Sequence, residues 1–452
     1  MSLLNKKKYI YTIGALYVLL PLSFFKAKVL FIFSLVALVL LIFAWIKNLF
    51  LKMIFLYLFS ASLFGLSFGG IKLFDIIVIF SFIYLCISHN MKVIITNYIN
   101  WFYFFMVYVF FSFMILSFID HANEFLLIQE LFRFIMAIFT LLTFSQKCFS
   151  TINNKTIVWI VNYIGFVLLL QIIVMSICQS HFGSPSNLNF GPLSVNVFDY
   201  NNSPISSMNE ERVSAFFSDP NKLMCFFFLL LLLKKSITTS QLELHDIIFL
   251  SGALLTGART AFVVVLIYLI ICTTRQSFKF CEPLGASFLA IVTILVGLYI
   301  YIKDISVGIL INNFFRKVLS FAGREQTLKT DSNVQSDSRI IIWKIAQQYI
   351  FKKPIFGNGI LSESILLPYP THNTIIQLIL DYGVIGFAIY VVAIMKIIMK
   401  HINIVDWILL LLIPSLVLDL ANYNCIFFVF AIILCKNRKD KDIGNYGNTG
   451  IN

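Results

Sequence analysis

The sequence predicts an all-α, polytopic integral membrane bundle of about 12–14 spans, because apolar stretches near the length of a spanning helix recur along it. Composition supports this fold class. Of the 452 residues, 60% are hydrophobic and 12% are charged, and the mean hydropathy is +0.91. A soluble fold could not bury so much apolar surface, whereas a membrane protein places it against lipid. The eight cysteines include no CxxC pair, so neither a zinc site nor a disulfide framework is indicated.

The predicted spans fall into three groups separated by polar segments at 179–212 and 304–371. We interpret Lys6-Lys7-Lys8 as the flank of a retained first span, because no small-residue cleavage site follows. The two short runs in the middle group are either two spans or one re-entrant hairpin, and both readings preserve the parity of the chain. The apolar runs are 9–25, 28–46, 49–68, 71–88, 101–119, 125–145, 156–178, 213–233, 244–256, 260–272, 285–303, 373–399, 405–418 and 421–435.

The positive charges predict the orientation of the chain. Lysine and arginine outnumber the acidic residues by 34 to 21, and no basic arm or aromatic-interleaved basic patch indicates nucleic acid as a partner. With the N-terminal lysines in the cytoplasm, the other span-flanking cations fall on the same side, as the positive-inside rule expects. Both long polar segments then face outward, which means the periplasm in a Gram-negative bacterium. The flanking cations are Lys47, Lys52, Lys92, Lys147, Lys155, Lys234, Lys235, Arg275, Lys279, Lys396, Lys400 and the tail from Lys436.

These boundaries divide the chain into five predicted segments. The tail is rich in glycine and asparagine, so we expect it to be disordered. The segments are an N-terminal transmembrane bundle (1–178), a periplasmic segment with central helices (179–303), a large periplasmic loop (304–371), C-terminal helices (373–435) and a cytoplasmic tail (436–452).

The first candidate site follows the first polar segment. Asp219 and Pro220 predict a helix start, with a capping oxygen followed by a residue that needs no N–H in the first turn. The apolar stretch 213–217 before it indicates a chain break at membrane depth, which is tolerated only where it lines a buried or wet cavity. Arg212 and Asn221 then lie at a cavity mouth beside a helix N-terminus that attracts anions. The alternative is that Arg212 pairs with one of the two preceding glutamates.

Two further arginines are predicted to face outward. Arg259 lies in the tight link Gly257-Ala258-Arg259-Thr260. At membrane depth its charge costs about 2.5–3.5 kcal/mol, so it needs an anionic partner unless it snorkels to lipid headgroups. Arg339 opens a predicted interfacial amphipathic helix, in which Trp343 lies on the same face one turn later. The alternative for that helix is a purely structural lid.

The fourth candidate is Thr371-His372-Asn373, where the longest polar segment meets an apolar run. A histidine at a helix start favours a neutral imidazole that can accept a proton. Gly383 and Gly386 let a neighbouring helix or a lipid chain come close. Taken alone, such a histidine is more often a structural hydrogen-bonding group, but three outward-facing arginines favour a catalytic or acceptor-positioning role.

Three arginines and one histidine suit one kind of reaction. Arginine binds diphosphate oxygens with two parallel hydrogen bonds and stays charged, so it can stabilise a leaving group. A neutral histidine can remove the proton from an attacking hydroxyl. We therefore predict metal-independent group transfer without a cofactor. Glu130 and Arg133, one turn apart in an apolar run, indicate an intramembrane pair that supports the bundle.

These motifs, taken in order, resemble the O-antigen polymerase and O-antigen ligase superfamily. The resemblance covers about residues 200–390 and rests on Arg212 with the Phe217–Asn221 string, Gly257–Thr260, Arg339 with Trp343 and Gly357-Asn358-Gly359, and His372-Asn373 with the two glycines that follow. The family link usually reads Ser-Arg, so Ala258 departs from it. Ligases often have leucine where this chain has Trp343, which favours a polymerase.

The resemblance implies an inner-membrane, lipid-linked glycosyltransferase of GT-C-like architecture, with both termini cytoplasmic and a periplasmic active site. The growing glycan would move from undecaprenyl diphosphate to a hydroxyl of the next undecaprenyl-diphosphate-linked repeat unit. Arg212, Arg259 and Arg339 would hold the diphosphates, and His372 would activate or position the acceptor hydroxyl. Asn373, Asp219, Asn221, Trp343, Gly383 and Gly386 would support them.

Two alternatives remain at the level of sequence. An O-antigen ligase shares the donor chemistry but delivers polymer to lipid A-core. A lipid-linked oligosaccharide flippase is also a many-span protein, but it typically lacks a 68-residue outer loop with an amphipathic helix. The expected partners are the lipid-linked oligosaccharide, membrane lipid, a chain-length regulator and a flippase, and no nucleic acid.

Overall fold

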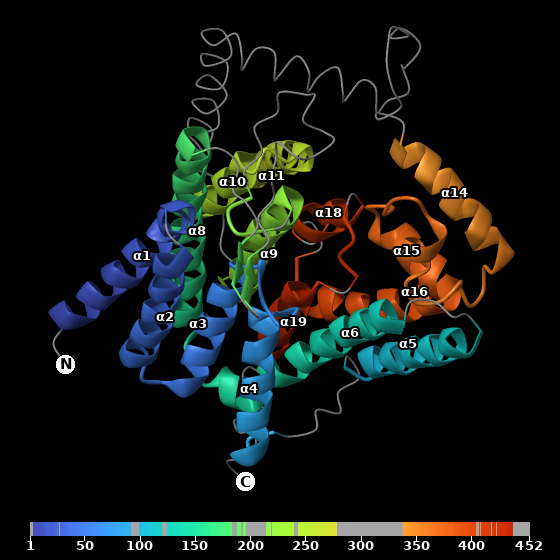
Figure 1. The fold of residues 1–452 in the computed structure, drawn as a ribbon, viewed down its shortest axis with the longest axis horizontal. Coiled ribbons are helices and arrows are strands. Elements are labelled where there is room, and N and C mark those ends of the chain that lie inside the picture. The colour runs from blue at the N-terminus through green and yellow to red at the C-terminus, as the bar shows by residue number, and fades with distance from the viewer. Residues whose placement is uncertain are drawn as a thin grey trace, which may run out of the picture.

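The computed structural model is helical apart from one small sheet, so the predicted all-α class is confirmed. Figure 1 shows the helices in chain order. The structure describes residues 3–26, 28–91, 99–119, 124–182, 188–190, 193–195, 214–217, 219–238, 243–277, 338–403, 406, 408–416, 418–421 and 423–436. The predicted span at 285–303, most of the large loop and the tail lie outside these residues.

The N-terminal helices follow the predicted spans closely. Helix α1 packs against both α2 and α8. Two hydrogen bonds join α1 to α8: Tyr163 donates to the Ile10 carbonyl at 2.8 Å, and the Gln171 amide donates to the Tyr17 carbonyl at 3.1 Å. The helices of the first seven runs, with the short α7 between the sixth and seventh runs, are α1 (Leu3–Lys26), α2 (Lys28–Trp45), α3 (Leu49–Ala61), α4 (Leu73–Ile87), α5 (Ile99–Ile119), α6 (Glu124–Phe144), α7 (Lys147–Ser150) and α8 (Asn154–Phe182).

A four-stranded antiparallel sheet was not predicted. The run expected at 49–68 ends as a helix at Ala61, and the chain then turns through Gly69 and Gly70, whose φ angles of 58° and 84° suit glycine in a tight turn. The strand order is β2–β1–β4–β3, from β1 (Leu66–Phe68), β2 (Ile71–Lys72), β3 (Leu188–Phe190) and β4 (Leu193–Val195). The sheet therefore ties the first polar segment to the connection between α3 and α4.

The remaining helices run from α9 to α19. Helix α16 has a kink, because Gly383 adopts a φ of 65° and a ψ of −172° inside it. Among the described residues of the predicted run at 405–418 lie two short helical pieces, over 408–412 and 413–415. The helices are α9 (Pro220–Thr238), α10 (Asp246–Leu255), α11 (Arg259–Ser277), α14 (Ser338–Lys352), α15 (Ser362–Leu366), α16 (Thr374–His401), the π-helix η2 (Ile408–Leu412), α18 (Ile413–Ser415) and α19 (Asn424–Lys436).

The described helices indicate an integral membrane protein. Two of them, over Asn154–Gln179 and Thr374–Met399, are both long and apolar enough to cross a bilayer, and several apolar helices are shorter. Large hydrophobic side chains are exposed along α2 and α5, which suits contact with lipid rather than water. They include Val29, Leu30, Phe33, Val36, Leu40, Phe43, Phe104, Val107, Phe110, Phe111 and Met114.

The arrangement of helices brings several helix starts to one end of the molecule. Figure 1 shows α5, α6 and α16 side by side, with α14 across the start of α16. The start of α19 lies near the start of α9, because Tyr423 donates to the Lys222 carbonyl at 3.5 Å. It also meets the start of α4, where the Asn424 amide donates to Asp75 at 2.5 Å. The predicted outward-facing ends of these helices therefore meet, and the candidate site lies there.

The opposite ends of these helices carry the predicted cytoplasmic lysines. At the end of α9, the ammonium groups of Lys234 and Lys235 bind the two carboxylate oxygens of Asp246 at 2.6 Å and 2.5 Å. At the end of α19, Lys436 donates to the carbonyls of Ser150 and Ile152 beside α7. These bonds satisfy lysines that are themselves buried, as buried charges require.

Candidate functional site

His372 lies just before α16 in a left-handed conformation. Its φ is 49°, which is uncommon for a residue other than glycine. The sequence placed this histidine at the helix start, but Asn373 is the N-cap, and its side-chain oxygen accepts hydrogen bonds from the N–H groups of Ile375 and Ile376 at 3.0 Å and 3.2 Å. His372 is therefore one position before the cap, with 42% of its side chain exposed.

Asp419 is the acidic neighbour of His372. Its Oδ2 lies 3.7 Å from His372 Nδ1, and its Oδ1 accepts the Asn373 N–H at 3.0 Å. A distance of 3.7 Å is an ion-pair contact rather than a direct hydrogen bond, and catalytic contacts often shorten when substrate binds. The chain beside Asp419 is held to α16 by Thr374, whose hydroxyl donates to the Leu418 carbonyl at 2.5 Å and accepts the Leu420 N–H at 2.9 Å.

Burial raises the pKa of Asp419 to about 7. The negative charge of Glu363 contributes to this rise, while the positive charge of Lys222 and the hydrogen bond from the Asn373 N–H lower the pKa. The carboxyl group therefore changes its charge near neutral pH. A group that titrates there next to a partly exposed histidine is suited to proton transfer.

Thr371 is held from two sides, which fixes the residue that precedes His372. Trp343 of α14 donates its indole N–H to the Thr371 carbonyl at 2.8 Å. On the other side, the Thr371 N–H and hydroxyl both donate to the carboxylate of Glu363 in α15. Glu363 is buried, and its own N–H donates to Asp381 at 3.3 Å. The conformation of His372 thus depends on contacts from α14, α15 and Asp419.

Helix α14 packs on the start of α16, as the predicted spacing requires. Ile342 and Ala346 are buried with Leu367 and Leu380, so this face of the helix is the packed one. The helix is therefore confirmed, and its Trp343 has a structural role that the sequence did not specify.

The two glycines of α16 are sites of close approach. The Gly383 kink receives the turn at Gly357 through backbone hydrogen bonds, from the Asn358 N–H to the Leu380 carbonyl and from the Gly359 N–H to the Asp381 carbonyl, both at 2.8 Å. Gly386 receives the ring of Tyr108 from α5, since a Cβ there would lie 2.8 Å from the Tyr108 Cε1 atom. At both glycines, the group that comes close is therefore part of the protein rather than a lipid chain.

Asp219 and Asn221 have the predicted helix-start geometry. The Asn221 N–H donates to Asp219 Oδ1 at 2.8 Å, and α9 begins at Pro220. The preceding turn, 214–217, has a left-handed Ala215, and three of its residues are fully buried. The predicted break before α9 is therefore present as a buried turn, and its depth in the membrane stays a prediction.

The three predicted arginines are not tested by the structure. Arg212 lies outside the described residues. Arg259 and Arg339 are at the starts of α11 and α14, and only their backbones are described. Their roles stay predictions. Glu130 and Arg133 do form the predicted pair, at 2.7 Å in α6.

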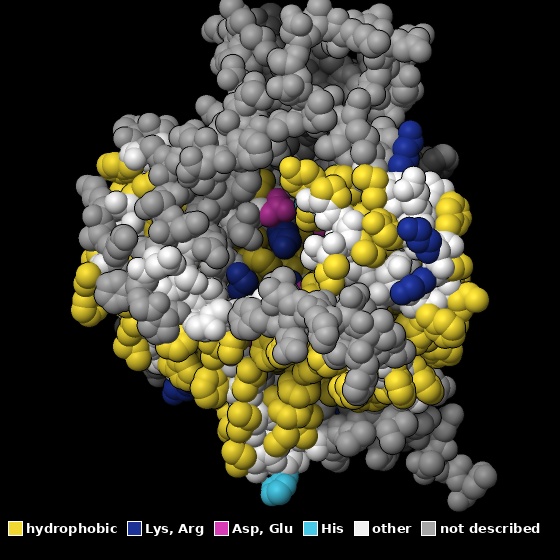
Figure 2. All heavy atoms as spheres, turned by 45° about the vertical axis from the view of Figure 1, so that its right-hand side comes forward, with side chains coloured by type: hydrophobic (Ala, Val, Ile, Leu, Met, Phe, Trp, Pro, Cys, Tyr) yellow, Lys and Arg dark blue, Asp and Glu magenta, His cyan; other side chains and the backbone are white. Residues whose placement is uncertain are grey.

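Sequence reasoning does not assign a role to several acidic and basic members of this site. They are Asp419, Asp381, Glu363, Lys72 and Lys222. The one available signal was a charged residue beside an apolar run, which marks a functional position by default. Figure 2 shows acidic and basic side chains inside a hollow framed by hydrophobic side chains.

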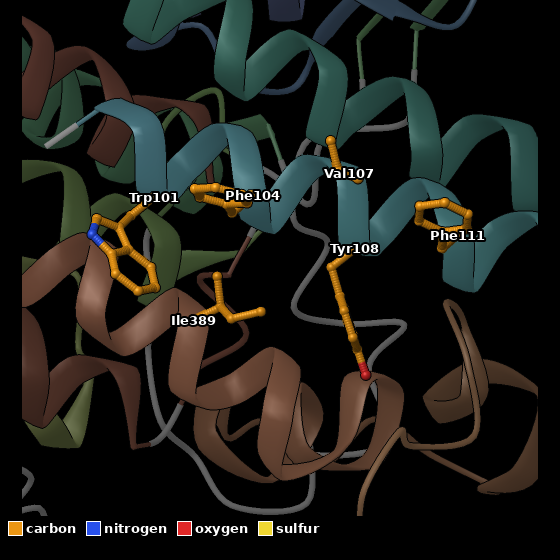
Figure 3. Close-up of a pocket in the computed structure, with 6 residues that line it drawn as sticks. All are labelled: Trp101, Phe104, Val107, Tyr108, Phe111 and Ile389. Carbon is orange, nitrogen blue, oxygen red and sulfur yellow. The ribbon is translucent and has the colours of Figure 1, made fainter. Parts of the chain in front are cut away.

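A separate groove of about 360 Å³ lies between α5 and α16. Figure 3 shows Tyr108 crossing from α5 toward α16, where its hydroxyl donates to the Tyr382 carbonyl at 2.9 Å. None of the groove-lining residues carries a charge, so the groove is distinct from the polar site around His372. They are Trp101, Phe104, Val107, Tyr108, Phe111 and Ile389.

The fold and site together define a helical integral membrane protein with a histidine–carboxylate pair where several helices begin. Residues 246–391, from α10 into α16, match the family model described as O-antigen ligase. This match supports membership of the O-antigen polymerase and ligase superfamily, whose members are glycosyltransferase-like enzymes. The matched region covers roughly a third of the chain and includes Arg259, Arg339 and His372. No curated protein matches the chain.

Proposed function

We propose that this protein is an O-antigen polymerase of the bacterial inner membrane, with its active site on the periplasmic face. It would transfer a growing glycan from undecaprenyl diphosphate to a hydroxyl of the next undecaprenyl-diphosphate-linked repeat unit. The observation that carries the proposal is the His372–Asp419 pair, which lies at the meeting helix starts and has a partly exposed imidazole. The resemblance to the superfamily supports a lipid-linked class of substrate.

In the proposed step, the acceptor hydroxyl attacks the anomeric carbon of the donor glycan. The bond from that carbon to the diphosphate oxygen breaks, and undecaprenyl diphosphate leaves with the bonding electron pair. His372 takes the proton of the attacking hydroxyl, and the Asp419 carboxylate stabilises the imidazolium that forms. Arg212, Arg259 and Arg339 would neutralise the charge on the leaving diphosphate, which is why the proposal needs neither a metal nor a cofactor.

A ligase remains the second candidate, because the matching family model is described as O-antigen ligase. Trp343 favours the polymerase, since ligases often have leucine there and leucine could not donate the hydrogen bond to Thr371. A chain-length regulator and a flippase would be its partners in either case.

Reconstitution of the purified protein separates the two enzymes. With lipid-linked repeat units as the only substrate, a polymerase is expected to produce a ladder of lengthened lipid-linked glycans on a sizing gel. A ligase would require lipid A-core and would attach glycan to it. Product that forms only with lipid A-core would exclude the polymerase proposal. Transport of intact repeats without any new glycosidic bond would indicate a flippase instead.

The pH dependence of turnover is expected to follow Asp419. Because its pKa is raised to about 7, the carboxyl is neutral below that pH and charged above it. Only the charged form can stabilise the imidazolium, so turnover should fall as the pH decreases through about 7 and level off above it. Asp419→Asn should lower turnover and remove this inflection. An unchanged inflection in the variant would assign the titration to another group.

A further inference from the structure

The ammonium groups of two lysines lie against the same aromatic ring, that of Phe64. The ammonium group of Lys72, at the end of β2, lies 5.2 Å from the centre of the Phe64 ring, and that of Lys222, in the first turn of α9, lies 5.4 Å from it. The ring itself is held in place by stacking on Phe74 and on Phe217, each with ring centres 5.6 Å apart. Residues far apart in the chain therefore bring two cations to one rigid platform.

In the part of the chain that the structure describes, no direct ion pair balances the positive charge of this lysine pair. Among the described residues, no carboxylate oxygen lies within 4.0 Å of either ammonium group. Burial, followed by the charges of Lys222 and Arg133, lowers the pKa of Lys72 to about 8, and Asp75 only partly opposes this shift. Asp75 already accepts a hydrogen bond from Asn424, and Arg133 is paired with Glu130. The charge of Lys222 disfavours the charged form of Lys72, and an anion bound by both lysines would offset this repulsion.

The lysine pair adjoins the His372 centre. The positive charge of Lys222 lowers the pKa of Asp419, and Asp419 contacts His372. Tyr423 donates to the Lys222 carbonyl and lies edge-on to Phe64 at 5.5 Å between ring centres. Asp219, three residues before Lys222, accepts the Asn221 N–H at the start of α9. The chain from Asp419, which contacts His372, to Tyr423, which contacts Lys222 and Phe64, therefore links the lysine pair to the His372 centre.

We propose that Lys72 and Lys222, placed against Phe64, bind the diphosphate group of a lipid-linked substrate next to His372. A diphosphate carries several oxygens that can each accept from an ammonium group, and a prenyl chain attached to it would extend among the apolar helices. This inference rests on the proposed function, but it assigns binding to side chains that are separate from the predicted arginines. Other anions of the same chemistry are phospholipid headgroups and free diphosphate.

The proposal is tested by measuring how tightly the purified full chain binds undecaprenyl diphosphate. Native mass spectrometry and a fluorescence titration in detergent give this affinity. Lys72→Gln and Lys222→Gln are each expected to weaken binding about tenfold, the usual effect of losing a hydrogen bond to a charged group. Lys222→Arg should keep most of the affinity because it keeps the charge. The matched control is Lys52→Gln, since Lys52 lies 4.6 Å from the Phe43 ring centre at the predicted cytoplasmic end.

Competition distinguishes the source of the anion. Displacement by undecaprenyl diphosphate at concentrations where phosphatidylglycerol and inorganic diphosphate do not compete would support the proposal. Equal competition by either of the latter two would overturn it in favour of a headgroup site or a free-anion site. Unchanged affinity in both glutamine variants would also overturn it, even if the wild type makes polymer. If the wild type makes no polymer but binds undecaprenyl diphosphate through the two lysines, the proposed function is rejected and the proposed binding site is retained.

Discussion

His372→Ala is expected to abolish polymer formation and to leave single-repeat lipid-linked intermediates on the periplasmic side. Without the imidazole, the acceptor hydroxyl loses its proton acceptor, which lowers turnover by about 10²–10⁴-fold. The measurement is product sizing in the reconstituted reaction, with lipopolysaccharide gels from cells as a second readout. Core bearing a single repeat would accompany loss of a polymerase, whereas bare core would accompany loss of a ligase.

Two variants separate the imidazole from the backbone at this position. His372→Asn keeps a residue that tolerates the left-handed φ, so it should be as inactive as the alanine variant if chemistry is lost. His89→Ala is the matched control, because His89 is exposed and has a similar φ of 54° at the predicted cytoplasmic end. Full activity in His372→Asn would contradict the assigned proton transfer.

Gly383→Ala is expected to prevent the protein from accumulating in a folded form. A Cβ at this position would lie 2.3 Å from the Ile355 carbonyl oxygen and 2.5 Å from the Gly357 nitrogen, and both are backbone atoms that cannot rotate away. The φ of 65° adds about 1–3 kcal/mol of strain for a residue with a side chain. Thermal unfolding in detergent, followed by tryptophan fluorescence, measures the effect.

Gly69→Ala is the control for backbone strain alone. Gly69 has a φ of 58°, close to that of Gly383, but no atom lies within 4 Å of the position of its Cβ. Its variant should unfold only a few degrees below the wild type. If the two variants lose the same thermal stability, then backbone strain, rather than the close contact with the 354–359 turn, explains the requirement for glycine at position 383.

Local signals in the sequence were sufficient to predict most helices. The start of α9 at Pro220 follows from one capping oxygen and one proline, and the buried face of α14 follows from helical spacing alone. These features depend on residues within a few positions of each other. The β-hairpin at 66–72 was missed because its strands are short and apolar like the flanking helices, and its partner strand β4 is more than 100 residues away in the chain.

The electrostatic part of the site could not be predicted in the same way. Asp419 meets the Asn373 N–H across 46 positions, and Asn424 meets Asp75 across 349. Lys72 and Lys222 come together only because the sheet and the start of α9 pack on Phe64. Which of many charged residues beside apolar runs converge is set by tertiary packing, for which a single sequence carries no local signal.

The joint between the 354–359 turn and the kink of α16 is made mainly of main-chain groups. Because N–H and carbonyl groups form most of its hydrogen bonds, the side chains of Ile355 and Phe356 are not what defines its geometry, and Asn358 alone adds side-chain bonds, to the Tyr349 and Leu380 carbonyls at 3.3 Å. Related proteins can therefore diverge widely at these positions and still keep the same joint, provided that glycine stands where the two backbones touch. Conservation in a future alignment should accordingly be sparse here, limited to isolated glycines amid variable neighbours.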